Sequence, residues 1–270
     1  MVDQSAELIN QVVDSLAQSV RYGQIDQGLV RRLARVELSK RAGFKNVVKA
    51  VKNKLHQVGG AYQEEKMDYN SWLADLKATE GLSADEFRLS LSRIMEHHAS
   101  TRERLPLLDK FYSTCLAGLP PIHSVLDIAC GLNPLSIPWM GLADRAKYLA
   151  ADIFQDMISF LNGALAFLPV DGRAVSCDVN AACPELPVDL ALALKTIPCL
   201  EQIDKTAGEH LLSTLQAKVM LISFPLRSLG GRDVGMTTNY EKRFLTLALE
   251  KHWKIERFVF KNELVFRVIK

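Results

Sequence analysis

The 270-residue sequence contains no apolar run approaching the roughly 18 residues that a membrane-spanning helix requires. Its start, MVDQSAELIN, has neither the basic residues nor the apolar core of a signal peptide. We therefore expect a cytoplasmic protein that has no membrane partner.

The cysteines are few and scattered, which argues against both disulfides and zinc. The five do not form a C-x-x-C pair and stand at Cys115, Cys130, Cys177, Cys183 and Cys199. His97 and His98 are adjacent, but no third metal ligand lies near them in the sequence. We predict free thiols and no metal site.

Glycine is missing where a phosphate-binding loop would need it. An apolar run from Ile122 ends in Asp127 and Ile128, and a loop with Ala129, Gly131 and Asn133 follows. A dinucleotide fingerprint needs three glycines for close approach to a pyrophosphate, so a nicotinamide oxidoreductase is disfavoured. Gly131 lacks a Cβ, and Asn133 is the next residue suited to a left-handed backbone. Asp127, Ala129 and Gly131 thus favour a phosphate-free nucleoside cofactor, S-adenosylmethionine (SAM), although the motif alone fits an ordinary strand-to-helix turn equally well.

Two further acids stand at the ends of predicted strands. Asp152 follows the apolar run 148–151 and precedes Ile153, and Asp178 follows the run 173–177 and precedes Val179. In nucleotide-binding α/β sheets the acid at the end of the second strand binds ribose hydroxyls. An acid at the end of the third strand can accept from an adenine amino group.

The net charge is only +2, yet the basic residues cluster near the N-terminus. Apolar periodicity predicts helices at 5–20, about 29–36 and 44–58, and further helical segments at 68–95. A cationic block on a near-neutral protein suggests a polyanionic partner, and a solvated face without a partner is the alternative. The candidate RNA-binding residues of this block are Arg31, Arg32, Arg35, Lys45, Lys49 and Lys52.

The segment from His98 to Leu105 combines a predicted helix start with two arginines. Ser100 and Glu103 have the spacing of a capping box. Cations are unfavourable near a helix N-terminus, and the planar forks of Arg102 and Arg104 fit a carboxylate such as that of SAM. Pairing of the arginines to acids of the same fold is the alternative.

From residue 120 onward, predicted strands and helices alternate. Strands are expected at 122–128, 148–152, 173–177, 190–194 and 218–223, followed by a hairpin of 254–260 and 263–269. Five parallel strands and such a hairpin predict an α/β, Rossmann-like, seven-stranded SAM-methyltransferase sheet.

Several of these segments closely resemble the aminoglycoside-resistance 16S ribosomal RNA methyltransferases that modify N7 of guanine 1405 in the decoding-site helix. The resemblance spans about residues 45–270 and lies in 98–105, 125–134, Leu200-Glu201, 223–232, Gly235-Met236 and Tyr240. It implies a helical RNA-binding domain, which we place at 1–75, on a methyltransferase domain at 76–270. It also implies a 30S subunit as substrate and resistance to gentamicin- and kanamycin-type drugs. We expect a monomer.

The resemblance also implies positions for the cofactor contacts. They are Tyr62, His98, Ala99, Ser100, Thr101, Arg102, Glu103, Arg104, Ala129, Asp152, Asp178, Val179 and Leu194, to which we add Asp127, Gly131 and Ile153. The residues after Lys195 depart from the family's leucine-rich version, because Thr196, Ile197 and Cys199 replace leucines.

Guanine N7 carries a free lone pair, so its methylation needs no base and depends mainly on positioning. N7 lies in the deep groove of an RNA helix, which favours flipping the base out. We assign Arg232 and, more weakly, Lys195 to the catalytic side of the pocket, with Met236 and Tyr240 packing on the guanine. A surface lid that makes no RNA contact is the alternative for this loop.

Other functions remain possible from the residues alone. A small-molecule methyltransferase would share the SAM residues but would have little use for a basic helical appendage. A methyltransferase of another rRNA nucleotide would share both features. A non-enzymatic RNA-binding module would not need Asp152 and Asp178 at successive strand ends.

Overall fold

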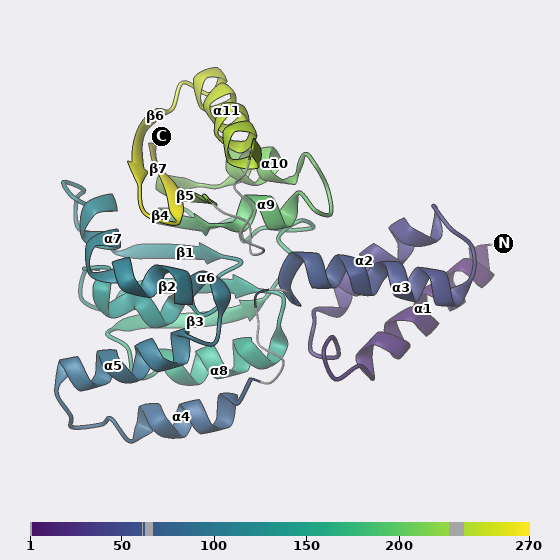
Figure 1. Cartoon of the computed structure of the whole chain (residues 1–270), viewed down its shortest axis with the longest axis horizontal. Coiled ribbons are helices and arrows are strands. Elements are labelled where there is room, and N and C mark those ends of the chain that lie inside the picture. The colour runs from purple at the N-terminus through teal and green to yellow at the C-terminus, as the bar shows by residue number, and fades with distance from the viewer. Residues whose placement is uncertain (1, 61, 63–66, 227–234) are drawn as a thin grey trace.

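The computed structural model describes residues 2–60, 62, 67–226 and 235–270. A seven-stranded sheet forms its centre, with strand order β3-β2-β1-β4-β5-β7-β6 (Figure 1). The strands are β1 (Ser124–Ile128), β2 (Ala146–Asp152), β3 (Val170–Ser176), β4 (Val188–Leu194), β5 (Ala217–Pro225), β6 (Lys254–Val259) and β7 (Glu263–Ile269). The first five pair in parallel, and β7 pairs antiparallel to both β5 and β6. This confirms the predicted seven-stranded α/β fold.

The order of the strands creates a crevice between β1 and β4. The chain builds outward from β1 to β3 and then returns to start β4 on the other side of β1. At such a reversal the connections leave in opposite directions, and ligands bind beyond the carboxyl ends of the strands. Strands β1 and β4 are almost continuously buried, as expected for central parallel strands covered on both faces.

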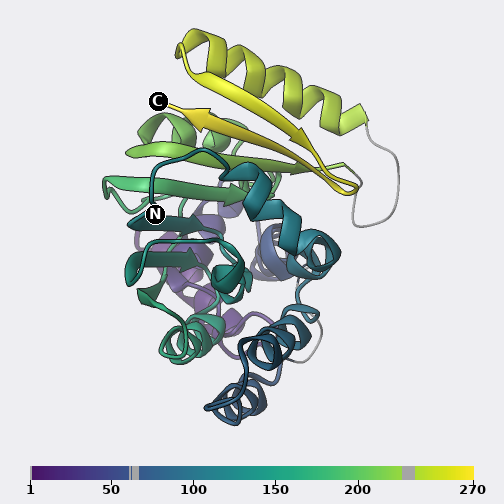
Figure 2. The same cartoon turned by 90° about the vertical axis from the view of Figure 1, so that its left-hand side faces the viewer.

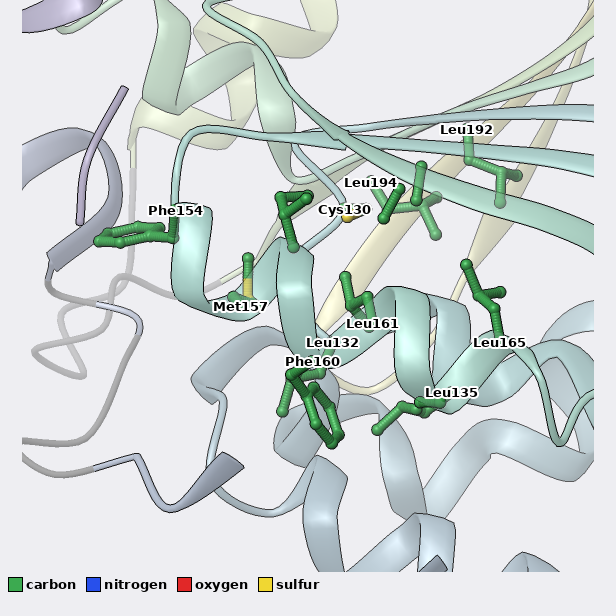
Figure 3. Close-up of a cluster of buried hydrophobic side chains, with 14 of the residues drawn as sticks. Cys130, Leu132, Leu135, Phe154, Met157, Phe160, Leu161, Leu165, Leu192 and Leu194 are labelled. Atoms are coloured by element: carbon green, nitrogen blue, oxygen red, sulfur yellow. The ribbon is translucent and has the colours of Figure 1, made fainter. Parts of the chain in front are cut away.

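One face of the sheet is covered by α8 (Gln155–Leu165) and by segments that precede β1. Leu161 and Leu165 of α8 lie toward Leu192 and Leu194 of β4 in the buried cluster of Figure 3. Outside α8 lie α4 (Tyr69–Lys77) and α5 (Ala84–Met95), and the remaining elements of this layer are α6 (Ala99–Arg104), η2 (Leu105–Leu107), α7 (Leu108–Cys115) and η3 (Asn133–Trp139).

The opposite face is covered by α9 (Thr196–Leu200), α10 (Ala207–Thr214) and α11 (Gly235–Glu250). Figure 2 shows α11 lying along the β6–β7 hairpin at one edge of the sheet. Phe244 of α11 packs on Phe266 of β7, with ring centroids 4.6 Å apart. The two faces therefore have separate apolar cores.

Three N-terminal helices form a module beside the carboxyl ends of the strands (Figure 1). They are α1 (Val2–Ala17), α2 (Gln27–Leu38) and α3 (Phe44–Leu55), and a π-helical turn, η1 (His56–Gly60), follows α3. Buried Leu16, Leu33 and Val51 belong to the core of this module. The three predicted helices are confirmed, with the first and the third each ending about three residues earlier than expected.

The expected domain boundary at residue 75 would divide α4. This helix packs on α8, where Leu73 fills the space beside Gly163 and Tyr69 stacks on Phe160 at 5.2 Å. Helix α4 thus belongs to the layer that covers the sheet, and we propose that the N-terminal module ends near Gly60.

The expected capping box of Ser100 and Glu103 is wrong. Helix α6 begins after His98, which provides no side-chain cap, and the Ser100 hydroxyl instead lies 3.1 Å from His98 Nδ1. A capping box does form one helix earlier, between Ser83 and Glu86. The helical segment is interrupted at Pro106, where the chain forms the short 3-10 helix η2, because proline has no backbone N–H to donate in a continuous α-helix.

Among the described residues, no helix is long and apolar enough to cross a membrane. Within the same residues, no group of three or more His, Cys, Asp or Glu side chains is placed to hold a metal ion.

Candidate functional site

A pocket of about 720 Å³, including its open mouth, lies beyond the carboxyl ends of the central strands. It brings together residues from both the sheet and the N-terminal module. Of the predicted cofactor residues, those that line it are Tyr62, His98, Ser100, Ala129, Asp152, Ile153, Asp178, Val179 and Leu194; Lys195 lines it too. Its size and mainly apolar wall, with a few polar groups, are typical of a small-molecule site.

The loop after β1 makes a tight turn in which two residues adopt left-handed backbone conformations. Ala129 has φ 49° and Gly131 has φ 52°. A Cβ at Gly131 would lie 2.6 Å from the His98 ring, so only glycine fits. The sequence suggested a left-handed backbone at Asn133, and this is wrong, because Asn133 is the first residue of η3. Its buried side chain instead donates to Asp127 at 2.9 Å.

Asp152 holds this loop against the end of β2. Its carboxylate accepts from the Gly131 amide at 2.9 Å and from the Ile153 amide at 2.7 Å. Burial raises the pKa of the side chain, and these amide hydrogen bonds oppose that effect. The Phe154 amide acts on the carboxylate in the same way, so of its roughly four lone-pair sites about one remains for a ligand's hydroxyl group.

Asp178 follows β3 at the neighbouring edge of the pocket. It accepts both donors of the Arg32 guanidinium, at 2.8 and 3.0 Å, and the Asn180 amide at 3.1 Å. Arg32 was expected to face RNA, and in the structure it turns inward instead. The face of α2 that carries Arg32 is thus part of the pocket's surroundings.

A cluster of four charges, three of them buried and Glu103 half-buried, lies at the pocket's inner end. Lys195 has a left-handed backbone (φ 58°) and is only 5% exposed. Its ammonium pairs with Glu103 at 2.5 Å and lies 3.7 Å from Glu263. Arg104 binds Glu263 through two hydrogen bonds, at 2.7 and 3.1 Å. Two cations and two carboxylates balance here, and no net charge faces the pocket from this cluster.

Glu263 comes from β7, far from the other members in sequence, and sequence reasoning missed it. Burial acts to raise its pKa, yet the charges of Arg104 and Lys195 hold that pKa below its usual value. The pairing of Arg104 matches the alternative considered for the arginines, namely an acid of the same fold. Arg102 is exposed and donates to the Glu96 carbonyl at 3.1 Å.

His98 and Tyr62 form the wall opposite the strand ends. Burial, with the charges of Arg104 and Lys195, lowers the pKa of His98 to about 4, so the ring is neutral at physiological pH. Tyr62 stacks parallel to it, with centroids 6.2 Å apart, and accepts a hydrogen bond from the Cys199 thiol at 3.2 Å. Neither ring therefore adds charge to the pocket.

Seven predicted cofactor residues do not line the pocket. Ala99, Thr101, Arg102, Glu103, Arg104, Asp127 and Gly131 lie behind or beside its wall. Thr101, for example, is buried and donates to the Met95 carbonyl at 2.6 Å. Asp127 lies beneath the loop and accepts from Tyr148 at 2.7 Å. These contacts support the lining residues.

Sequence reasoning also missed the pocket residues that the N-terminal module provides. Leu29, Val58 and Gly59 line the pocket, and a Cβ at Gly59 would lie 2.7 Å from the Phe154 ring. Helical periodicity marks Leu29 as buried but cannot indicate which element covers it.

The other predicted basic residues have different surroundings. Arg31, Arg35, Lys45 and Lys49 are exposed on α2 and α3, and Lys52 is half-buried. Lys54 of α3 reaches the Gln202 carbonyl at 2.5 Å and ties the module to the loop after α9.

The predicted target-side residues are only partly described. Arg232 lies outside the described residues, as does the side chain of Met236. Tyr240 of α11 is half-buried and stacks on Phe224 at 5.7 Å. Burial raises the pKa of its hydroxyl, which stays protonated.

A pocket with acids at successive strand ends, closed by a basic helical module, is consistent with a methyltransferase that acts on nucleic acid. The family model described as "Ribosomal RNA methyltransferase (FmrO)" matches residues 18–267. The chain belongs to this family of ribosomal RNA methyltransferases.

Curated relatives of this FmrO-family chain match over most of their length. A 16S rRNA (guanine(1405)-N(7))-methyltransferase of Micromonospora echinospora is 37% identical over 97% of both chains. An enzyme of the same name from Serratia marcescens is 35% identical over 87% of this chain and 88% of its own. Both the helical module and the sheet are therefore shared with enzymes of one name.

Solved structures agree with this family assignment. The 16S rRNA methyltransferase RmtF, crystallised with S-adenosyl-L-homocysteine (SAH), is 30% identical, with a TM-score of 0.83 over 98% of both chains. The 16S rRNA methylase RmtB is 28% identical, with a TM-score of 0.80 over 97% of this chain and 98% of its own.

Proposed function

We propose that this chain transfers a methyl group from SAM to N7 of guanine 1405 in 16S rRNA, within the 30S subunit. The observation that carries the proposal is the joint presence of a nucleoside pocket and an exposed basic module in a chain 37% identical, over 97% of its length, to an enzyme of that activity. A small-molecule methyltransferase would not need the basic module.

The pocket residues fit SAM. Asp152 retains about one lone-pair site for a ribose hydroxyl, and Asp178 retains about one for the adenine amino group. Val179 and Leu194 provide apolar surface for the purine ring. When bound, SAM supplies an electrophilic methyl group on a sulfonium centre.

The chain's own part in the reaction is to position and to exclude water. N7 of guanine needs no deprotonation, so no side chain of the pocket has to act as a general base. Neutral His98 and the balanced Lys195–Glu103 pair add no net charge to the inner end of the pocket. Because the positive charge moves from sulfur to the guanine ring, a dry pocket suits the transfer better than a charged one.

The target RNA would approach over the N-terminal module. Exposed Arg31, Arg35, Lys45 and Lys49 are available for phosphates, which fix orientation without reading sequence. Arg232, Met236 and Tyr240 stay candidates for holding the flipped guanine. The methylated guanine carries a bulky positive group, which would oppose binding of cationic gentamicin- and kanamycin-type drugs. We propose that the enzyme acts as a monomer, in the cytoplasm, where a ribosomal substrate is found.

The experiment is to incubate 30S subunits with labelled SAM and purified protein, then map the modified base by reduction and strand cleavage. We expect one cleavage, at guanine 1405. Asp152→Ala is the matched inactive control. Cleavage at another guanine, or label in free small molecules only, would contradict the proposal.

A further inference from the structure

Helix α2 starts at a fixed position beside the pocket. Ile25 and Phe154 form an antiparallel bridge, and the Asp26 amide donates to the Ile153 carbonyl at 2.8 Å. Asp26 then caps α2 by accepting from the Leu29 amide at 2.8 Å. The end of β2 and the start of α2 are therefore joined through the backbone.

Arg32 lies one turn further along α2, on the face that carries Leu29. Its guanidinium forms a planar, bidentate pair with Asp178, which is 8% exposed. A bidentate pair fixes the plane of the carboxylate as well as its position. With the Asn180 amide, three of the carboxylate's roughly four lone-pair sites are occupied. One remains, on a residue that lines the pocket.

Arg32 differs in this respect from its neighbours. Arg31 and Arg35 are exposed on the same helix, whereas the Arg32 side chain is 26% exposed. The pKa of Asp204 is lowered mainly by hydrogen bonds from Thr206 and further by the Arg32 charge. The Arg32 charge therefore acts on two acids but pairs directly with Asp178, and binding a phosphate would require it to leave that partner.

We propose that Arg32 is a positioning residue of the cofactor site, which orients the Asp178 carboxylate toward the adenine amino group and thereby makes the N-terminal module part of donor selection. The inference rests on the proposed function in one respect only, namely that the methyl donor is SAM. It does not require that the substrate be ribosomal RNA. Its immediate consequence is that Arg32 strengthens the pocket's preference for a purine that carries a 6-amino group.

The test compares two probes by calorimetry. SAH carries the 6-amino group, and S-inosylhomocysteine carries a carbonyl oxygen in its place. The unaltered protein should prefer SAH, since Asp178 can only accept. Arg32→Ala should reduce that preference by about tenfold or more, because a hydrogen bond to a charged acceptor is worth roughly tenfold to a hundredfold in affinity. Arg32→Lys keeps the charge but not the fork, and should give an intermediate preference.

The controls separate orientation from general loosening of the module. Arg35→Ala, on the exposed side of the same helix, should leave both affinities unchanged. In an Asp178→Ala background, Arg32→Ala should have no further effect on the preference, because the group it orients is gone.

Each other outcome overturns the inference. An equal loss of affinity for both probes would mean that Arg32 only holds the module in place. An unchanged or increased preference would mean that Asp178 needs no orientation. If the protein methylated guanine 1405 but Arg32→Ala left the preference for SAH unchanged, only this inference would be refuted. If the unaltered protein did not bind SAH, the donor assignment and the proposed function would fall together.

Discussion

Asp127 provides a prediction about the pH dependence of stability. The side chain is 1% exposed, and burial raises its pKa to about 7, against hydrogen bonds from Asn133 and Tyr148 that act in the opposite direction. Because the folded-state pKa exceeds the unfolded one, the folded protein binds the extra proton. This contribution to stability is fully present below about pH 4 and is lost as pH rises to about 7.

The magnitude follows from the shift. About three pKa units correspond to roughly 4 kcal/mol, of which about 2 kcal/mol falls between pH 5 and pH 7. Asp127→Asn keeps an oxygen for both donors and cannot ionise. We expect the free energy of unfolding of Asp127→Asn, minus that of the unaltered protein, to rise by this amount from pH 5 to pH 7 and then to stay level.

The assay is urea unfolding at half-unit steps between pH 5 and pH 8. Asp189→Asn is the matched control, because the pKa of that carboxylate is lowered, chiefly by a hydrogen bond from Lys218. Its difference curve should be flat across this range. A flat curve for Asp127→Asn as well would refute the assignment of a buried, proton-binding carboxyl beneath the pocket.

Three further predictions concern separate parts of the molecule. Gly131→Ala should weaken SAH binding at least tenfold in calorimetry, because a Cβ there meets the His98 ring at 2.6 Å on a left-handed backbone; unchanged affinity would contradict the loop geometry. Arg104→Met removes both guanidinium hydrogen bonds from buried Glu263, leaves it only the more distant Lys195 as a cationic partner, and should lower the free energy of urea unfolding by about 3 kcal/mol; a neutral result would contradict the pairing. Reversing the charges of Lys45 and Lys49 should weaken 30S binding and reduce its salt dependence while SAH affinity stays constant; an equal loss of both would show a structural role.

Much of the fold could be predicted because its signals are local. Strand β1 reads as an apolar run, and an acid at the end of β2 is visible without any knowledge of the partner strands. The parallel order then follows from the alternation of strands and helices. The location of the pocket beyond the carboxyl ends of the strands could be predicted for the same reason.

The parts that could not be predicted depend on contacts between distant segments. Arg32 and Arg35 are equivalent in sequence, and only the docking of α2 on the strand ends turns Arg32 toward Asp178. From the sequence, Arg104 was predicted to bind a cofactor carboxylate. Its true partner, Glu263, lies 159 positions away and could not be identified without the fold. Helical periodicity reports which face is buried and carries no information on what covers it.

The wall of the pocket that the N-terminal module builds has a practical consequence for inhibitor design. Leu29 and Val58 line the pocket from α2 and η1, outside the sheet domain. A methyltransferase without such a module has no counterpart to this surface. A SAM-competitive compound that extends to these two side chains should therefore discriminate against such enzymes, whereas one confined to the strand ends should not.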